Sequence, residues 1–307
     1  MLQVKRSTIA LYLAPMFFAI AVVNLWPIFY TFILSFTNKD LYHLDTYHYT
    51  GLQNYTATLG SLQGDFFTII LQTLLYVVVC VSLFLVIGLA TALALNNQRI
   101  WFLPFWRLVL ILPWTIPSVI TALIWKFLFH YDFGTINQLL RLAFGPDAGV
   151  PWLTTPWGAF IAVVIVNVWL SYPFFTIVIL GALQSVPQEL NEAANVDGAN
   201  SWQRFRHITL PLLRPAITPA TILSAITTFQ MFNTVFLITQ GGPITSPLKP
   251  GATSFVMIYV YNKLFGATGG NPPYGRMAAV AVVLFALLLF MTMLSLRASN
   301  VTKEAQA

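Results

Sequence analysis

The sequence predicts an all-helical membrane protein with six transmembrane helices in one permease-like domain that covers residues 1–307. Of its residues, 58% are hydrophobic and only 8% are charged, whereas charged residues make up about 25% of a typical soluble domain. The apolar residues form long blocks without Asp, Glu, Lys or Arg, each long enough for a bilayer-spanning helix of about 20 residues. Spans are expected near residues 9–37, 67–96, 108–130, 158–184, 216–240 and 277–297.

The first block differs from a cleaved secretory signal. Lys5 and Arg6 precede it, as they would precede a signal, but the apolar run continues past Trp26 and Tyr30 without a small-residue cleavage site. We therefore expect a retained helix.

Basic residues near the span ends predict the orientation, because cytoplasmic loops are enriched in Lys and Arg. Counting alternate sides, nine basic residues lie with the two termini and six lie opposite. The protein is therefore expected to cross the cell (inner) membrane several times, with both termini in the cytoplasm. The nine are Lys5, Arg6, Arg99, Arg107, Arg204, Arg206, Arg214, Arg297 and Lys303. They form no stripe that would indicate nucleic-acid binding.

The spans lack the groups that would drive transport or catalysis. Ion-coupled carriers use buried carboxylates or a coupling-ion site between broken helices, and these spans hold almost no ionisable residues. No P-loop, metalloprotease motif or nucleophile elbow is present. We therefore predict no catalytic residues, metal site or cofactor in this chain. His43 and His48 flank Asp45 and could bind metal, but packing at the membrane interface is favoured. A membrane enzyme and an ion-coupled carrier remain alternative classes.

Prolines inside the spans indicate a pathway. Proline removes a backbone donor and kinks a helix, and such breaks are tolerated at membrane depth where protein or a water-filled cavity satisfies the freed groups. Spans four and five also carry uncharged polar residues beside aromatic ones, a combination that suits a neutral polyhydroxylated solute. Hydrogen bonds between helices explain any single one of them equally well. The prolines are Pro113, Pro117, Pro173, Pro215 and Pro219, and the polar residues include Tyr172, Gln230 and Asn233.

One long polar loop, residues 185–211, lies between spans four and five. Pro187 suits a first helical turn and Gly198 a left-handed stop, so a short helix is expected between them. Its Leu190, Ala193 and Ala194 share one face. A helix this short is not stable alone and needs a partner's groove or its own membrane domain to pack against.

Within this loop, Glu192-Ala-Ala, Asp197-Gly-Ala and the following Phe205, Ile208, Leu210 and Pro211 resemble the E-A-A loop of binding-protein-dependent ABC importer permeases. The resemblance implies a type I importer fold and a coupling helix that seats in an ATPase subunit. ATP and Mg would be bound by two such subunits. It also implies a second permease subunit in a heterodimer and an extracytoplasmic sugar-binding protein. The implied ATPase-coupling residues are Glu189, Glu192, Ala193, Ala194, Asp197 and Gly198.

Further stretches, such as 112–117, 167–173 and 239–243, resemble the carbohydrate branch of the family and its short six-span form. The resemblance implies import of a di- or oligosaccharide by alternating access. The outer loop, 241–275, is longer than a simple turn, is rich in Gly and Pro and contains a run of aromatic residues, so we expect an interfacial helix within it. The implied substrate path consists of Asn167, Leu170, Ser171, Phe174, Ser224, Thr227, Thr228 and Met231. Another small solute, such as glycerol phosphate, remains the alternative substrate.

Overall fold

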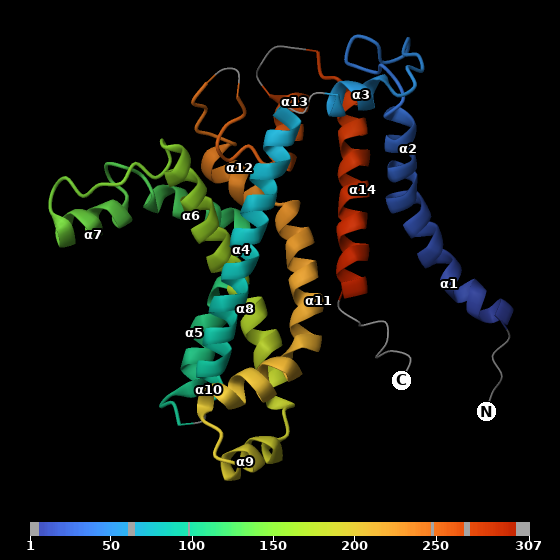
Figure 1. Cartoon of the computed structure of the whole chain (residues 1–307). Coiled ribbons are helices and arrows are strands. Elements are labelled where there is room, and N and C mark those ends of the chain that lie inside the picture. Colours follow the sequence, from blue (N-terminus) through green and yellow to red (C-terminus); the bar gives the residue numbers. More distant parts are fainter. Residues whose placement is uncertain (1–5, 61–64, 98, 247–248, 267–270, 299–307) are drawn as a thin grey trace. The chain divides into compact units, whose positions relative to one another are not determined.

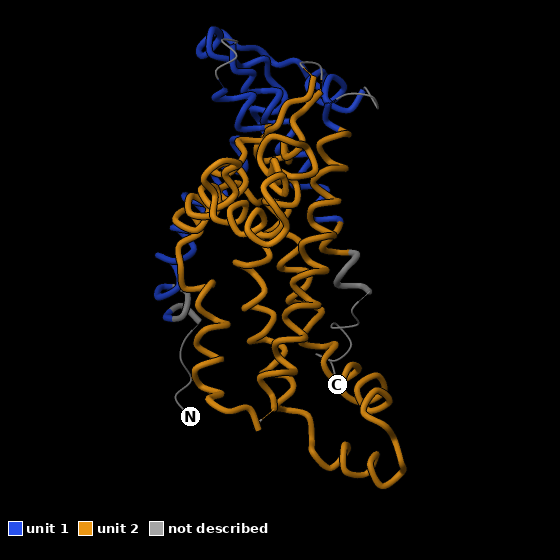
Figure 2. Tube along the Cα trace, turned by 90° about the vertical axis from the view of Figure 1, so that its left-hand side faces the viewer, with its two compact units in different colours: residues 1–66, 260–290 blue, residues 67–259, 291–307 orange. Residues whose placement is uncertain are grey.

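The computed structural model describes residues 6–60, 65–97, 99–246, 249–266 and 271–298. Over these residues the regular secondary structure is helical (Figure 1), apart from one isolated bridge between Thr37 and Tyr49. Lys5 and Lys303, used above for orientation, lie outside the described residues. Two compact units are present (Figure 2): Met1–Phe66 with Val260–Phe290, and Phe67–Tyr259 with Met291–Ala307. The single domain expected from the sequence stays a prediction.

Five continuous helical stretches in the described part of the chain are long and apolar enough to cross a membrane, and a bent pair of helices adds a sixth. They confirm that the apolar blocks form helices. Three bounds differ by more than a few residues from those expected. The helices of the third and fifth blocks begin earlier, at Leu103 and Ser201, and the fifth stretch ends earlier, at Phe229, because a break follows it. The five stretches are Leu11–Leu34, Asp65–Leu95, Pro156–Gln184, Ser201–Phe229 and Tyr274–Met293.

The first unit contains the N-terminal helices and most of α14. Its elements are α1 (Arg6–Ile20), η1 (Ala21–Leu25), α2 (Trp26–Leu34), α3 (Gln53–Leu59) and α14 (Tyr274–Ala298), which continues beyond it. The side chain of Asn54 joins α3 to the end of α2, because its Nδ2 donates to the carbonyl oxygens of Ser35 and Thr37 at 2.9 and 2.8 Å.

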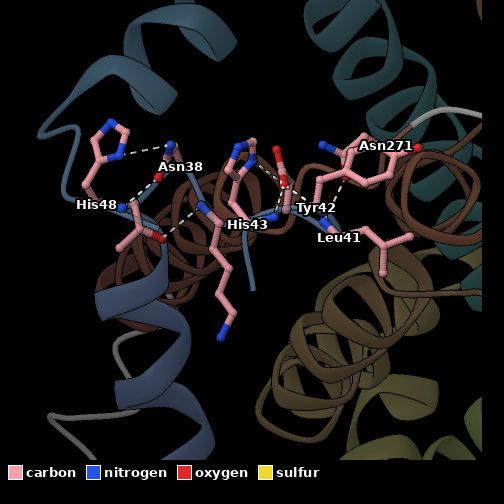
Figure 3. A network of polar contacts seen from close by, with 9 residues as sticks. Asn38, Leu41, Tyr42, His43, His48 and Asn271 are labelled. Carbon is pink, nitrogen blue, oxygen red and sulfur yellow. Dashed lines mark hydrogen bonds and ion pairs between the residues drawn. The ribbon is translucent and has the colours of Figure 1, made fainter. Parts of the chain in front are cut away.

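A polar network orders the loop after α2 (Figure 3). Asp40 Oδ1 accepts hydrogen bonds from the backbone nitrogens of Tyr42 and His43, at 3.0 and 2.8 Å, and lies 2.8 Å from His43 Nδ1. His48 instead pairs with Asn38, whose Oδ1 accepts from the His48 backbone at 2.8 Å. The two histidines therefore bind different partners within the loop and do not meet at Asp45.

In the second unit, α4 (Asp65–Leu95) packs against the long helix α8 (Pro156–Gln184). Tyr76 of α4 stacks on Phe255 with ring centroids 4.3 Å apart, and Thr73 Oγ1 accepts a hydrogen bond from Val256 N at 3.1 Å. These contacts fix the start of α13 (Val256–Phe265), the helix expected within the outer loop. Residues 247–248 and 267–270 of that loop lie outside the described residues.

Two helix breaks distinguish this unit. α5 (Leu103–Thr115) and α6 (Ser118–Leu128) meet at 95°. Pro117 causes this bend, because proline cannot donate to the helix and it forces the preceding residue into an extended conformation; Ile116 has φ −88° and ψ 130°. The span expected at 108–130 is therefore two helices. After α6 comes the short helix α7 (Thr135–Phe144).

The second break lies in the span expected at 216–240. α11 (Leu210–Phe229) is followed by its C-cap residue Gln230, and α12 (Asn233–Thr239) begins three residues after that cap. Pro215 and Pro219 lie inside α11 without ending it. No proline or glycine marks this second break, so it has no local signal in the sequence. α12 packs against both α6 and α8, which brings the two breaks to the same part of the unit.

Candidate functional site

A cavity of about 600 Å³ opens where the two breaks face the middle of α8. We call it the translocation cavity. Unwound backbone at membrane depth is tolerated where it lines such a space, and transporters use broken helices in this way. Its lining residues are Trp114, Thr115, Ile116, Pro117, Ser118, Asn167, Leu170, Ser171, Thr227, Gln230, Met231, Phe232, Asn233 and Thr234. None of these described residues is charged.

Asn167 forms the back of the translocation cavity. Its side chain is 0% exposed and close to Tyr76 and Cys80 of α4. Ser171 Oγ, one turn further along α8, donates to Asn167 Oδ1 at 3.4 Å, whereas Asn167 Nδ2 makes no hydrogen bond. A buried amide donor without a partner is costly. Asn167 lines the cavity, and its side chain is also within hydrogen-bonding reach of Tyr76 and Cys80.

Thr234 provides a second unused group in the same cavity. It lies in the first turn of α12, is 0% exposed, and its hydroxyl has no hydrogen-bond partner among the described atoms. Thr227 behaves differently, since its hydroxyl donates to carbonyl oxygens of α11 at 3.1 Å. Polar side chains of α8 and α12, with aromatic and aliphatic neighbours, therefore line a cavity of the kind that binds a neutral hydrogen-bonding ligand.

The structure brings together five of the eight residues predicted for the substrate path. The other three lie outside the lining. Ser224 and Thr228 are buried in the packing of α11, and the Phe174 ring contacts Trp114 with centroids 6.2 Å apart. The five lining residues are Asn167, Leu170, Ser171, Thr227 and Met231. Their role in binding stays a prediction.

The family resemblance did not predict Trp114–Ser118 or Thr234 as residues of the substrate path. Pro113 and Pro117 were the signal for the first group, because a proline pair inside an apolar block predicts a break and a break exposes polar backbone. Thr234 carried no signal in the sequence, because threonine is common inside membrane helices and its place in the cavity wall depends on the break before Asn233.

The polar loop forms the short helix expected from its sequence. α9 spans Gln188–Val196, with Pro187 as its N-cap and Glu189 in the first turn. Gly198 has φ +78° and ends the helix in the left-handed region, where residues with a Cβ are strained. α10 (Ser201–Arg204) follows, closed by reciprocal hydrogen bonds between Asn200 and Gln203.

No residue of α9 is buried, and the helix lies beyond the ends of α8 and α11 (Figure 1). Glu189, Glu192, Ala193, Asp197 and Gly198 are exposed, and Ala194 is half-buried. Large apolar side chains are also uncovered here: Val196 is 89% and Trp202 65% exposed. Such a patch beside a protruding helix is typical of a docking surface.

The sequence profile of the family described as "Binding-protein-dependent transport system inner membrane component" matches residues 84–300. The chain belongs to this family. The permease is similar to the "Trehalose/maltose transport system permease protein MalF" of Thermococcus litoralis, with 33% identity over 96% of this chain and 94% of the relative. It is also similar to the "Galactooligosaccharides transport system permease protein GanP" of Bacillus subtilis, with 30% identity over 94% of this chain and 69% of the relative.

A solved structure, "Crystal structure of bacterial alginate ABC transporter in complex with alginate pentasaccharide-bound periplasmic protein", contains a chain with the same fold. The TM-score is 0.76 with 21% identity, and the match covers 95% of the permease and 94% of that chain. The permease therefore has the type I ABC importer permease fold, and it is a multi-pass membrane transport component rather than an enzyme.

Proposed function

We propose that the permease translocates a neutral di- or oligosaccharide by alternating access, driven by ATPase subunits that dock on α9. The translocation cavity carries this proposal. It combines uncharged hydrogen-bonding groups with aromatic walls. A carbohydrate offers hydroxyl groups for the first kind of contact and the apolar faces of its rings for the second. The names of the relatives, which refer to trehalose, maltose and galactooligosaccharides, support the same class of solute.

The energy source is proposed to lie in partner subunits. α9 is too short to be stable alone, and none of its residues is buried. It ends in the uncovered side chain of Val196, and the uncovered Trp202 follows. A groove in an ATPase subunit would cover them. In the orientation expected from the basic residues, α9 and both termini lie in the cytoplasm.

The remaining partners follow from the transport cycle. A second permease subunit, in a heterodimer with this one, would close the open side of the translocation cavity. Two ATPase subunits would bind ATP and Mg, one of them seated on α9. An extracytoplasmic binding protein would deliver the sugar from the other side of the membrane.

The test uses the complete transporter reconstituted in vesicles with its binding protein. We expect ATP-dependent uptake of at least one of maltose, trehalose and maltotriose. Thr234→Val removes the unpartnered hydroxyl without changing the side-chain volume much. Losing one hydrogen bond of about 1 kcal/mol to the sugar should lower uptake at limiting sugar about fivefold, while the melting temperature stays the same or rises.

Thr221→Val is the matched control. Thr221 is also a threonine of this unit, but its hydroxyl donates to its own helix at Ile217 O, 2.8 Å away, and it does not line the cavity. Uptake should be unchanged. Uptake of all three sugars without ATP, or equal uptake by the two Val variants, would contradict the proposal.

Glycerol 3-phosphate serves as the competing solute. A phosphate group requires cationic partners, and the described residues that line the translocation cavity include none. We therefore expect no ATP-dependent uptake of glycerol 3-phosphate under conditions in which a sugar is transported.

A further inference from the structure

A second cavity, of about 320 Å³, lies between α5 and α8 on the side nearer α9. α5 contributes Arg107 and Ile111, and α8 contributes Ile177, Leu180 and Gln184 to its lining. We call it the inner cavity. Its walls are mostly apolar. Its polar lining residues are Arg107, Thr176 and Gln184, and Gln184 lies at the end of α8 that leads to α9.

The translocation cavity and the inner cavity follow one face of α8. Leu170 lines the first, whereas Ile177 and Gln184 line the second. These positions recur every seven residues, close to two helical turns, so their side chains share a face. On α5, Arg107 and Ile111 line the inner cavity and Trp114 lines the translocation cavity. The two cavities therefore lie in sequence along the same pair of packed helices.

An aromatic pair lies between them. The rings of Trp114 and Phe174 contact each other with centroids 6.2 Å apart. Phe174 follows Leu170 by one turn and precedes Ile177 by one turn on the shared face of α8. Passage from one cavity to the other along this face requires the two rings to separate.

Arg107 gives the inner cavity its chemical character. Its Nε is buried and has no hydrogen-bond partner among the described atoms. A guanidinium N–H group without a partner is costly in mostly apolar surroundings. Guanidinium groups only donate, so the ligand must present acceptors, and sugar hydroxyl groups do so. Gln184 can both donate and accept in the same cavity, and Ile111 and Ile177 would contact the apolar faces of a sugar ring.

We propose that the inner cavity is a second sugar subsite, in which Arg107 and Gln184 hold the solute after it passes the Trp114–Phe174 pair and before it is released. This inference rests on the proposed function. It adds a transient binding step on the exit side of the translocation cavity, and it makes Arg107 a sugar-binding residue.

The test adds one reporter cysteine at a time to the permease, in the reconstituted transporter with all its partner subunits. The unmodified protein is the background, because its one cysteine, Cys80, is 0% exposed. Leu180→Cys reports on the inner cavity and Ser171→Cys on the translocation cavity. A membrane-impermeant thiol reagent is applied from the α9 side without nucleotide, with and without the sugar that the unmodified transporter takes up.

We expect sugar at about ten times its dissociation constant to slow modification of Leu180→Cys about tenfold. Adding Arg107→Leu should abolish this protection, while Ser171→Cys, read out with a permeant reagent, stays protected. Arg107→Gln, which retains N–H donors, should restore part of the protection at Leu180→Cys.

Equal modification rates of Leu180→Cys with and without sugar would overturn the inner subsite, and so would full protection in the Arg107→Leu variant. A reporter that is never modified would mean that a partner subunit fills the inner cavity, which also overturns it. These outcomes differ from failure of the proposed function, which would appear as absence of ATP-dependent sugar uptake by the unmodified transporter.

Discussion

The hydroxyl groups of Thr91 and Thr176 lie 2.7 Å apart and link α4 to α8 near the inner cavity. One turn before Thr91, Gly88 meets α8 so closely that a Cβ there would overlap the Cβ of Phe175. Small residues allow membrane helices to approach in this way, and the polar bond adds to the packing. α8, which carries the polar wall of the translocation cavity, is therefore held in place by α4.

Gly88→Ala should destabilise the permease. The added methyl group has no room against Phe175, and overpacking of this kind costs about 1–3 kcal/mol. Thermal unfolding in detergent should show a lower melting temperature than for Gly181→Ala, because no atom lies within 4 Å of a Cβ built at Gly181. Equal melting temperatures for the two variants would show that α4 and α8 are not this closely packed.

Pro117→Ala should impair sugar uptake with little loss of stability. Alanine restores a backbone donor and removes the restriction on Ile116, so a continuous helix competes with the bend between α5 and α6. A preference of about 1.4 kcal/mol for the straight form would lower uptake about tenfold. Pro104→Ala is the control, since Pro104 lies in the first turn of α5, where proline is tolerated. A similar loss in both variants would argue against a specific role for the bend.

Gly198→Val should weaken the sugar-stimulated ATP hydrolysis of the docked ATPase subunits. The backbone at Gly198 has φ +78°, and no atom lies within 4 Å of a Cβ built there, so the effect of a side chain is conformational rather than steric. The left-handed conformation costs about 1–2 kcal/mol for residues with a Cβ, which should shift α9 and lower sugar-stimulated ATP hydrolysis about tenfold. Gly198→Asn should retain most activity, because asparagine tolerates this conformation. Normal ATP hydrolysis in the Val variant would refute the coupling role.

The loop after α2 should loosen at acidic pH. Burial raises the pKa of Asp40, but hydrogen bonds from His43 and Asn271 outweigh this effect and leave the pKa below its ordinary value of 3.8. A lowered carboxyl pKa stabilises the fold above the unfolded-state value, and this contribution is lost as the pH falls through the folded-state value. Hydrogen exchange at the amides of Tyr42 and His43, corrected for its intrinsic pH dependence, should therefore be constant near neutral pH and accelerate below about pH 4.

The Asp40→Asn variant provides the control for that titration. It should exchange faster at these two amides at neutral pH and lose the acidic transition, because asparagine does not titrate in this range. An acidic transition that persists in Asp40→Asn would assign the effect to another group.

The sequence by itself determined the apolar helices, the helix α9 and the prolines at which a helix can bend; of these, Pro117 lies at a break, whereas Pro173, Pro215 and Pro219 lie inside continuous helices. Each depends on local chemistry: a long block without charges, a missing backbone donor, or a proline before a helix and a glycine after it. The E-A-A pattern also identified the family before any comparison. These features depend on residues that are close in the sequence and not on how the helices pack against one another, which is why they could be predicted.

Tertiary structure decided which polar residues share a cavity. Thr227 and Thr228 are neighbours in sequence, yet Thr227 lines the translocation cavity and Thr228 is buried. The break before Asn233, which turns Thr234 towards the cavity, has no proline or glycine to predict it. Packing of α12 against α6 and α8 holds that break open, and the rotation of a helix about its axis is set by its neighbours rather than by its own sequence.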